Sequence, residues 1–299
     1  MRRKWIAAVL ALVLGLLCAC AAPAAEPDAM RVAATTYPVW QFTCAVAEGT
    51  GLTVERLVTE PVSCLHDYSL SVEQMKKLER SSLVVISGMG LEDFMADVLP
   101  EDGRVIDASE GIAAICAEEH EDGHGHHGHD HGHDGADPHI WLDPARAAQM
   151  VQNICAGLSA QYPEYKAAFE KNAGEYCERL GVLTDELRQG LSELSCRELV
   201  TFHDGFSYFA EAFGLSIAAA MEVEAGSEAP AGELEEIVRL IEREGLPAVF
   251  VEQSGDDAAA SIVAAETGVT VGTLDMGMSE RDYFSAMRQN MQAIKGALG

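Results

Sequence analysis

The sequence predicts an α/β protein with two Rossmann-like lobes of parallel sheet, flanked by helices and joined by one long rigid helix. Two stretches alternate short β-rich segments with amphipathic helical segments, which is the pattern of parallel sheets covered by helices. A long helical pattern without strand signals separates the two stretches. At 299 residues, the chain is also long enough for two domains.

The first half supplies four strand signals and three helix signals. We expect strands at 30–36, 52–58, 83–87 and 104–107. Helical patterns occupy 40–48, 71–80 and 91–98, and Ser69 or Ser71 can cap the second of these helices.

The middle of the chain holds a polar tract at 118–136, followed by two helical patterns. The tract lacks the apolar residues needed for a core. Asp143 and Pro144 suit a helix start, and that helix runs to about residue 160. A second pattern opens at Pro163 and continues to about residue 190, giving a predicted linking helix within 162–193 that is about 45 Å long if continuous.

The second half repeats the arrangement of the first. Strands are expected at 198–202, 215–221, 248–252 and 269–274, and helices at 205–213, 232–244, 256–267 and 282–298. The predicted lobes are therefore 30–161 and 194–299.

The N-terminus is typical of an exported lipoprotein. Basic residues at 2–4 precede a short apolar run that is too short to span a membrane. The run ends in a segment that resembles a bacterial lipobox, with Cys20 as the lipidated residue; Cys18 is the weaker choice because bulky Leu17 precedes it. We expect a signal peptide at 1–19, a tether at 20–29, and a chain anchored by lipid on the extracytoplasmic face of the cell membrane. The alternative is a signal peptide that is cleaved without lipidation. No later segment is apolar enough to cross a bilayer.

Charge excludes one class of partner. The chain has 48 Asp+Glu against 20 Lys+Arg, a formal net charge of −28, so its surface repels phosphate backbones and no nucleic-acid binding is expected. Solubility alone accounts for most of this charge.

The cysteines of the expected mature domain give little support for a sulfur-based metal site. They are widely spaced, without a CxxC pair, and their disulfide pairing cannot be deduced from sequence. They are Cys44, Cys64, Cys116, Cys155, Cys177 and Cys196.

Histidine is the informative residue type, because imidazole is a common ligand of transition metals. Seven of the ten histidines lie in the polar tract, where they can form weak accessory sites or a solvated loop. They are His120, His124, His126, His127, His129, His131 and His133.

The other three histidines are His66, His139 and His203. Each follows a predicted strand or precedes a predicted helix, and ligand sites in open α/β sheets lie beyond the carboxyl ends of strands. Each also has a neighbouring carboxylate that could orient its ring: Asp67, Asp137 and Asp204.

These motifs, in this order, resemble the zinc-receptor branch (cluster A-I) of the metal-binding lipoproteins of ABC importers, the ZnuA/TroA-like family. The segments that carry the resemblance are the lipobox, the loop with His66, the His-rich insert, Asp137-Pro138-His139-Ile140-Trp141-Leu142-Asp143-Pro144, the motif at 201–209 and Phe250-Val251-Glu252-Gln253.

The resemblance implies a metal in the cleft between two lobes, and delivery to a membrane permease driven by a cytoplasmic ATPase. It implies His66, His139 and His203 as ligands, with Asp275 as the fourth. Met276 follows Asp275 where the family usually has proline, so Glu252 remains a competitor and Cys64 an outside candidate. A monomer is expected.

Three imidazoles and one carboxylate fit tetrahedral Zn²⁺, whereas Mn²⁺ prefers more oxygen ligands. The alternatives are a manganese receptor or adhesin of the same fold and a zinc-dependent hydrolase. A site closed by a fourth protein ligand leaves no open position for catalysis, so no enzyme is expected. The turn at 87–90 lacks the third glycine of a dinucleotide fingerprint, and no P-loop is present.

Overall fold

The computed structural model describes residues 28–60, 65, 68–100, 102–115, 136–221 and 229–299. His66, Cys20, Cys64, Cys116 and the seven histidines of the tract lie outside the described residues. Within the described residues, no helix combines the length and the apolar character needed to cross a membrane.

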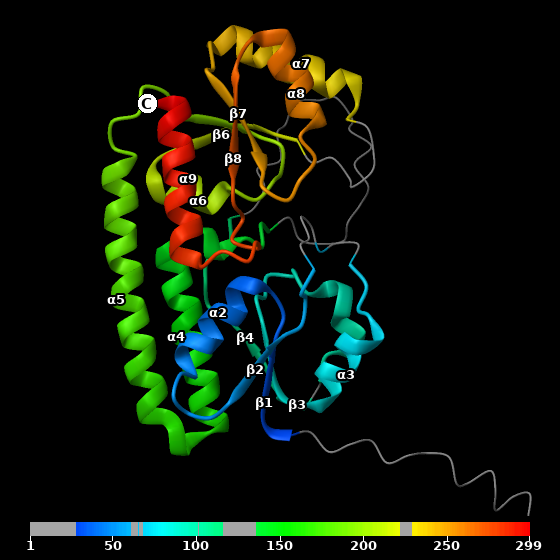
Figure 1. Ribbon diagram of the computed structural model, residues 1–299, viewed down its shortest axis with the longest axis vertical. Helices are drawn as coiled ribbons and strands as arrows, with labels where there is room; N and C mark the ends of the chain where they lie inside the picture. Colours follow the sequence, from blue (N-terminus) through cyan, green and yellow to red (C-terminus); the bar gives the residue numbers. More distant parts are fainter. Residues whose placement is uncertain (1–27, 61–64, 66–67, 101, 116–135, 222–228) are drawn as a thin grey trace, which may run out of the picture.

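The lower part of the molecule in Figure 1 is built on a sheet of four parallel strands in the order β2-β1-β3-β4. The strands are β1 Asp28–Ala34, β2 Thr53–Arg56, β3 Ser81–Ile86 and β4 Val105–Asp107. The helices that follow them are α2 Tyr37–Val46, α3 Val72–Arg80 and the 3₁₀ helix η1 Asp93–Val98. Every strand predicted in the first half is confirmed.

Local signals explain where two of these helices begin and end. The Ser71 hydroxyl oxygen accepts from the Gln74 N–H, and the Ser71 N–H donates to the Gln74 side-chain oxygen, so Ser71 is the cap of α3. The helix expected at 91–98 is a 3₁₀ helix rather than an α-helix. It has room for only two short turns, because Pro100 holds Leu99 in the extended region.

The upper part repeats this architecture, with four parallel strands in the order β6-β5-β7-β8. The strands are β5 Glu198–Thr201, β6 Ser216–Ala220, β7 Ala248–Glu252 and β8 Thr270–Leu274. The helices are α6 Ser207–Phe213, α7 Ala231–Glu244, α8 Ala258–Thr267 and α9 Tyr283–Leu298. The four predicted strands and the four predicted helices of the second half are all present.

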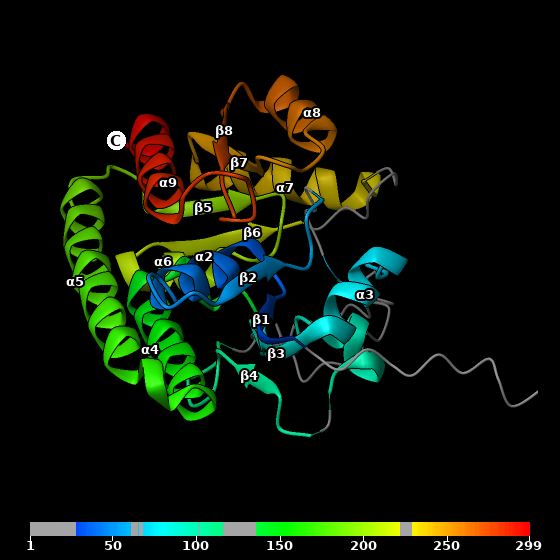
Figure 2. The same cartoon turned by 60° about the horizontal axis from the view of Figure 1, so that its bottom comes forward.

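Two long helices connect the sheets. Helix α4 Pro144–Gln161 is capped by the Asp143 carboxylate, as predicted, and packs against α5 Lys166–Gly190. Pro163 opens a short 3₁₀ turn, η3 Pro163–Tyr165, so the linking helix has 25 residues and is shorter than expected. Both views show α5 running along the side of the molecule, from the base of the first sheet toward the second (Figures 1 and 2).

One hydrophobic core runs through both lobes. It joins buried side chains of α2, α4, α5, α6 and α9, represented by Phe42, Met150, Leu183, Phe209 and Met287. The opposite face of each sheet has its own smaller core, and strand alternation divides the residues between faces. The shared core and α5 together fix how the two sheets sit relative to each other.

Four cysteines within the described residues are free thiols: Cys44, Cys155, Cys177 and Cys196. Burial raises the pKa of Cys44 to about 11, so this thiol is inert at neutral pH.

A buried carboxylate ties the strand ends of the first lobe together. Glu92 is 3% exposed, and it accepts hydrogen bonds from the Thr35 hydroxyl at 2.6 Å and from the N–H groups of Ser87 and Gly88 at 2.7 and 3.0 Å. Gly88 adopts φ +85°, and a Cβ there would collide with Asp107. Burial raises the pKa of Glu92 to about 7, and the charge of Asp107 adds to this effect.

Replacing Glu92 by Gln should therefore change how stability depends on pH. The folded pKa lies above the unfolded value, so the folded chain binds the extra proton, and stability falls as pH rises from about 5 to 8. Denaturant unfolding should show wild type losing about 2–3 kcal/mol more than Glu92→Gln across this range. Glu79→Gln, on the exposed face of α3, is the control and should follow wild type. Parallel pH curves for Glu92→Gln and wild type would contradict this account.

Candidate metal centre

His139 stands at the entry to α4, on a short and well-packed segment. It directly precedes the 3₁₀ helix η2 Ile140–Leu142, whose three residues are at most 1% exposed. Asp143 then caps α4. The apolar residues anchor this segment in the shared core, so His139 is held on a rigid support while remaining 8% exposed.

Asp137 orients the His139 ring. Its Oδ1 accepts from the His139 backbone N–H at 2.9 Å and lies 2.8 Å from Nδ1. A carboxylate accepts hydrogen bonds, so this contact places the proton on Nδ1 and leaves Nε2 as the nitrogen available to a metal.

His203 lies just beyond the carboxyl end of β5 and is 4% exposed. Its Nδ1 is 3.6 Å from an oxygen of Glu252, which ends β7 and is also buried. His203 therefore has a carboxylate on its Nδ1 side, as His139 does.

The two rings meet between the lobes. Their centroids are 5.3 Å apart and their planes are nearly perpendicular, at 80°. Gly205 makes this approach possible, because a Cβ there would lie 2.8 Å from His139 Nδ1 and 2.5 Å from the Met276 side chain.

Charge around His139 favours a cation. Burial lowers the pKa of His139, but the hydrogen bond and charge of Asp137, with the charges of Glu252 and Asp204, outweigh burial and raise the pKa above its usual value. The same negative field that favours a proton also favours a metal ion.

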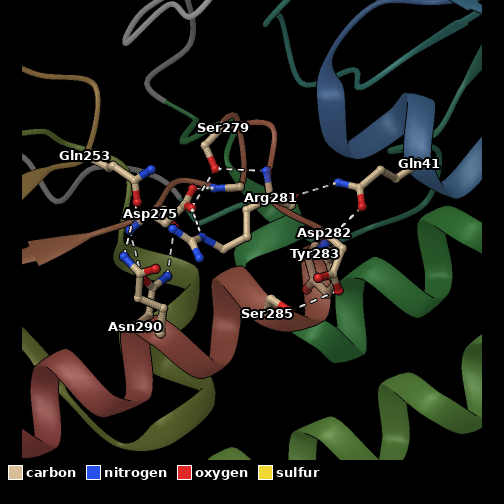
Figure 3. A network of polar contacts seen from close by, with 11 residues as sticks. Gln41, Gln253, Asp275, Ser279, Arg281, Asp282, Tyr283, Ser285 and Asn290 are labelled. Atoms are coloured by element: carbon tan, nitrogen blue, oxygen red, sulfur yellow. Dashed lines mark hydrogen bonds and ion pairs between the residues drawn. The ribbon is translucent and has the colours of Figure 1, made fainter.

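Asp275, at the end of β8, is 1% exposed and has its carboxylate turned into its own loop (Figure 3). Oδ1 accepts from the Gly277 N–H at 2.8 Å, and Oδ2 accepts from the Ser279 hydroxyl at 2.7 Å. The Arg281 guanidinium lies 3.4 Å from Oδ2 and compensates the charge. Asn290 brackets the Asp275 backbone with two further hydrogen bonds.

The described residues thus show part of the expected site. The structure brings His139 and His203 together, with Asp137 and Glu252 beside them. No group of three or more His, Cys, Asp or Glu that could hold a metal occurs within those residues, and the ligand assignment of Asp275 stays a prediction. His66, the third imidazole of the expected set, lies outside that part of the chain.

Sequence reasoning gave no role to three side chains near the site. The Tyr208 hydroxyl donates to the segment before His139. Arg281 pairs with Asp275, and Gln41 of α2 reaches the loop after β8 (Figure 3). The only signal in the sequence was the place of Tyr208 within the motif at 201–209. Arg281 and Gln41 gave none, because their partners are set by tertiary packing.

Trp141 connects the two lobes beside the site through hydrogen bonds. Its indole N–H donates to the Met276 carbonyl at 2.7 Å, and its own carbonyl accepts from the Tyr283 hydroxyl at 2.6 Å. Its ring also contacts His139, with centroids 5.3 Å apart. One residue therefore holds the entry to α4 against both ends of the loop between β8 and α9.

Two like α/β lobes with buried imidazoles meeting between them are the arrangement expected of a two-lobed metal receptor. The family model described as "Zinc-uptake complex component A periplasmic" matches residues 32–297, and the chain belongs to this family, as its motifs predicted.

Two relatives show the extent of the similarity. The zinc-binding lipoprotein AdcA of Streptococcus pneumoniae serotype 4 is 30% identical over 306 residues, covering 96% of this chain and 60% of AdcA. The chain therefore spans about 60% of the length of that relative. The high-affinity zinc uptake system protein ZnuA of Bacillus subtilis is 27% identical over 283 residues, covering 91% of this chain and 88% of that protein.

Solved structures confirm the predicted fold. A crystal structure of ZnuA superposes with a TM-score of 0.78 at 28% identity, covering 91% of this chain and 100% of the other. A laminin-binding adhesin of Streptococcus agalactiae gives a TM-score of 0.77 at 24% identity, covering 90% and 100%, and shows the shared fold alone.

Trp141→Phe should destabilise the protein by about 2–4 kcal/mol, because it leaves a buried carbonyl unpaired and a gap in the core. Denaturant unfolding measures the loss. Trp40→Phe is the matched control, since it also removes one indole bond to a carbonyl, that of Val54, but within a single lobe and at a partly buried position. Equal costs for the two variants would show that Trp141 has no special role between the lobes.

Proposed function

We propose that this chain is an extracytoplasmic receptor that captures Zn²⁺ between its lobes and delivers it to the permease of an ABC importer, powered by a cytoplasmic ATPase. Lipid on Cys20 would tether it to the membrane. The observation that carries the proposal is the pair of buried imidazoles of His139 and His203, which meet at 5.3 Å from different lobes. The names of AdcA and ZnuA, a zinc-binding lipoprotein and a zinc uptake protein, support the same cargo.

The proposed ligands are His66, His139 and His203, with Asp275 as the fourth. Zinc fits this nitrogen-rich set, whereas manganese prefers more oxygen ligands. The Asp137 carboxylate binds the Nδ1 of His139 and orients that ring, which leaves the Nε2 of His139 for the metal. The Glu252 carboxylate lies on the Nδ1 side of His203. The His-rich tract is proposed as an accessory collector with weaker sites.

A site whose ligands come from two lobes can both capture zinc and release it. Zinc is cargo here, so the site must bind tightly and then open, and no chemical step is part of the proposal. A small displacement of β5 relative to the entry of α4 separates His203 from His139 and weakens the site. Interfaces between lobes are natural points for such movement.

His139→Ala and His203→Ala should each abolish tight zinc binding, with a loss greater than the roughly 10–100-fold that removal of an orienting partner typically costs. Competition with a chromophoric chelator measures the affinity. His127→Ala, in the tract, is the control and should leave the tightest site unchanged. Wild-type affinity in either of the first two variants would refute that ligand assignment.

Arg281 and a metal compete for the same oxygen if Asp275 is the fourth ligand, because Oδ2 already contacts the guanidinium. Asp275→Asn should then weaken zinc binding. Arg281→Gln should tighten it by about two- to fivefold, the typical strength of a partly exposed ion pair.

The double variant tests whether Arg281 and zinc compete for the Asp275 carboxylate. In the Asp275→Asn background, Arg281→Gln should have no further effect on zinc affinity, because the contested carboxylate is gone. If Asp275→Asn binds zinc like wild type, the fourth position is filled without Asp275, by Glu252 or by water.

A further inference from the structure

The hydroxyl of Tyr208 sits at a junction that the proposed ligand set does not include. Tyr208 belongs to α6 and is fully buried. Its hydroxyl donates to the Asp137 carbonyl at 2.7 Å and accepts from the Ile115 N–H at 3.0 Å. One oxygen of the second lobe is therefore hydrogen-bonded to two separate segments of the first lobe.

Those two segments are also hydrogen-bonded to each other. The Asp137 N–H donates to the Ile115 carbonyl at 3.0 Å. Three hydrogen bonds thus connect Ile115, Asp137 and Tyr208 in a closed ring, so none of the three can shift without stretching a bond to the others.

The Arg146 side chain holds the Tyr208 ring in place. The Arg146 guanidinium of α4 lies 4.8 Å from the ring centroid. Arg146 in turn pairs with Asp143, the cap of α4, at 2.9 Å, and with Glu211 of α6 at 2.7 Å. The hydroxyl therefore occupies a fixed position, and its bond to Asp137 has a fixed direction.

Asp137 transmits this position to His139. Its backbone carbonyl accepts from Tyr208, while its carboxylate holds the His139 backbone N–H and Nδ1. Tyr208 also lies five residues after His203 on the segment that leads from β5 into α6. A single hydroxyl therefore joins the segment that carries His203 to the residue that orients His139.

We propose that Tyr208 is a positioning residue of the metal centre, whose hydroxyl sets the spacing and orientation of His139 relative to His203. The inference rests on the proposed function, since it assigns a role toward the same zinc site. It goes beyond that function by naming a side chain outside the proposed ligand set that constrains the segments carrying both rings.

Tyr208→Phe tests the hydroxyl alone, because the ring and its contact with Arg146 remain. We expect zinc affinity to fall by about tenfold, as when a partner that orients a metal ligand is removed. The absorption spectrum of the Co²⁺-loaded protein should also change, because it reports ligand geometry. A purely structural role would lower the free energy of unfolding and leave both of these readouts unchanged.

Tyr162→Phe is the matched control. Tyr162 is also buried, and its hydroxyl bonds Ser82 at 2.7 Å inside the first lobe, at the far end of α4 from His139. This variant should lose a comparable amount of stability while keeping the zinc affinity and Co²⁺ spectrum of wild type.

The outcomes separate this inference from the proposed function. If His139→Ala loses tight binding but Tyr208→Phe keeps the wild-type affinity and spectrum, the role of Tyr208 is refuted and the function stands. If His139→Ala binds zinc like wild type, the proposed site itself is wrong. Should Tyr208→Phe fail to fold, Arg146→Gln replaces it: this variant frees the ring but keeps the hydroxyl, and an unchanged affinity there overturns the inference.

Discussion

The two hydrogen bonds of Trp141 are the constraint on which the arrangement of the site depends. The indole N–H and the backbone carbonyl bind the two ends of the loop between β8 and α9, and the ring lies against His139. Because Ile140 and Leu142 on either side are fully buried, Trp141 cannot rotate away without exposing core. The place where the lobes are joined is therefore also the place where the imidazoles meet.

The shared hydrophobic core limits what the lobes can do. Helices α2, α4, α5, α6 and α9 bury side chains in one cluster, so opening the lobes widely would expose apolar surface at a cost of about 25 cal/mol per Å². Small displacements of the polar boundary, where hydrogen bonds can be exchanged, cost far less. Under the proposed function, the fold thus favours release of a metal by local rearrangement around His203 and the β8–α9 loop over a large hinge motion.

The sequence predicted the elements well, and the site only in part. Features that depend on nearby residues could be predicted from the sequence. They include the strand periodicity, the caps Ser71 and Asp143, and the positions of His139 and His203 at strand and helix ends. The ring of hydrogen bonds around Tyr208 joins residues 71 and 93 positions apart, so the place of Tyr208 in the motif at 201–209 did not reveal its partners. The 3₁₀ form of η1 was missed for a related reason, since a turn before it and Pro100 after it set its length jointly.

The buried carboxylates near the candidate metal centre serve two different purposes. Asp137 and Glu252 face the Nδ1 atoms of imidazoles, so their charge supports the rings whether or not a cation is bound. Asp275 instead organises its own loop, whose Arg281 carbonyl accepts from Gln41 and whose Tyr283 N–H donates to the same side chain (Figure 3). A metal held by imidazoles alone leaves this loop and its contact with α2 intact. A metal that recruits Asp275 must first exchange bonds of that loop, so occupancy of the site and contact between the lobes become coupled.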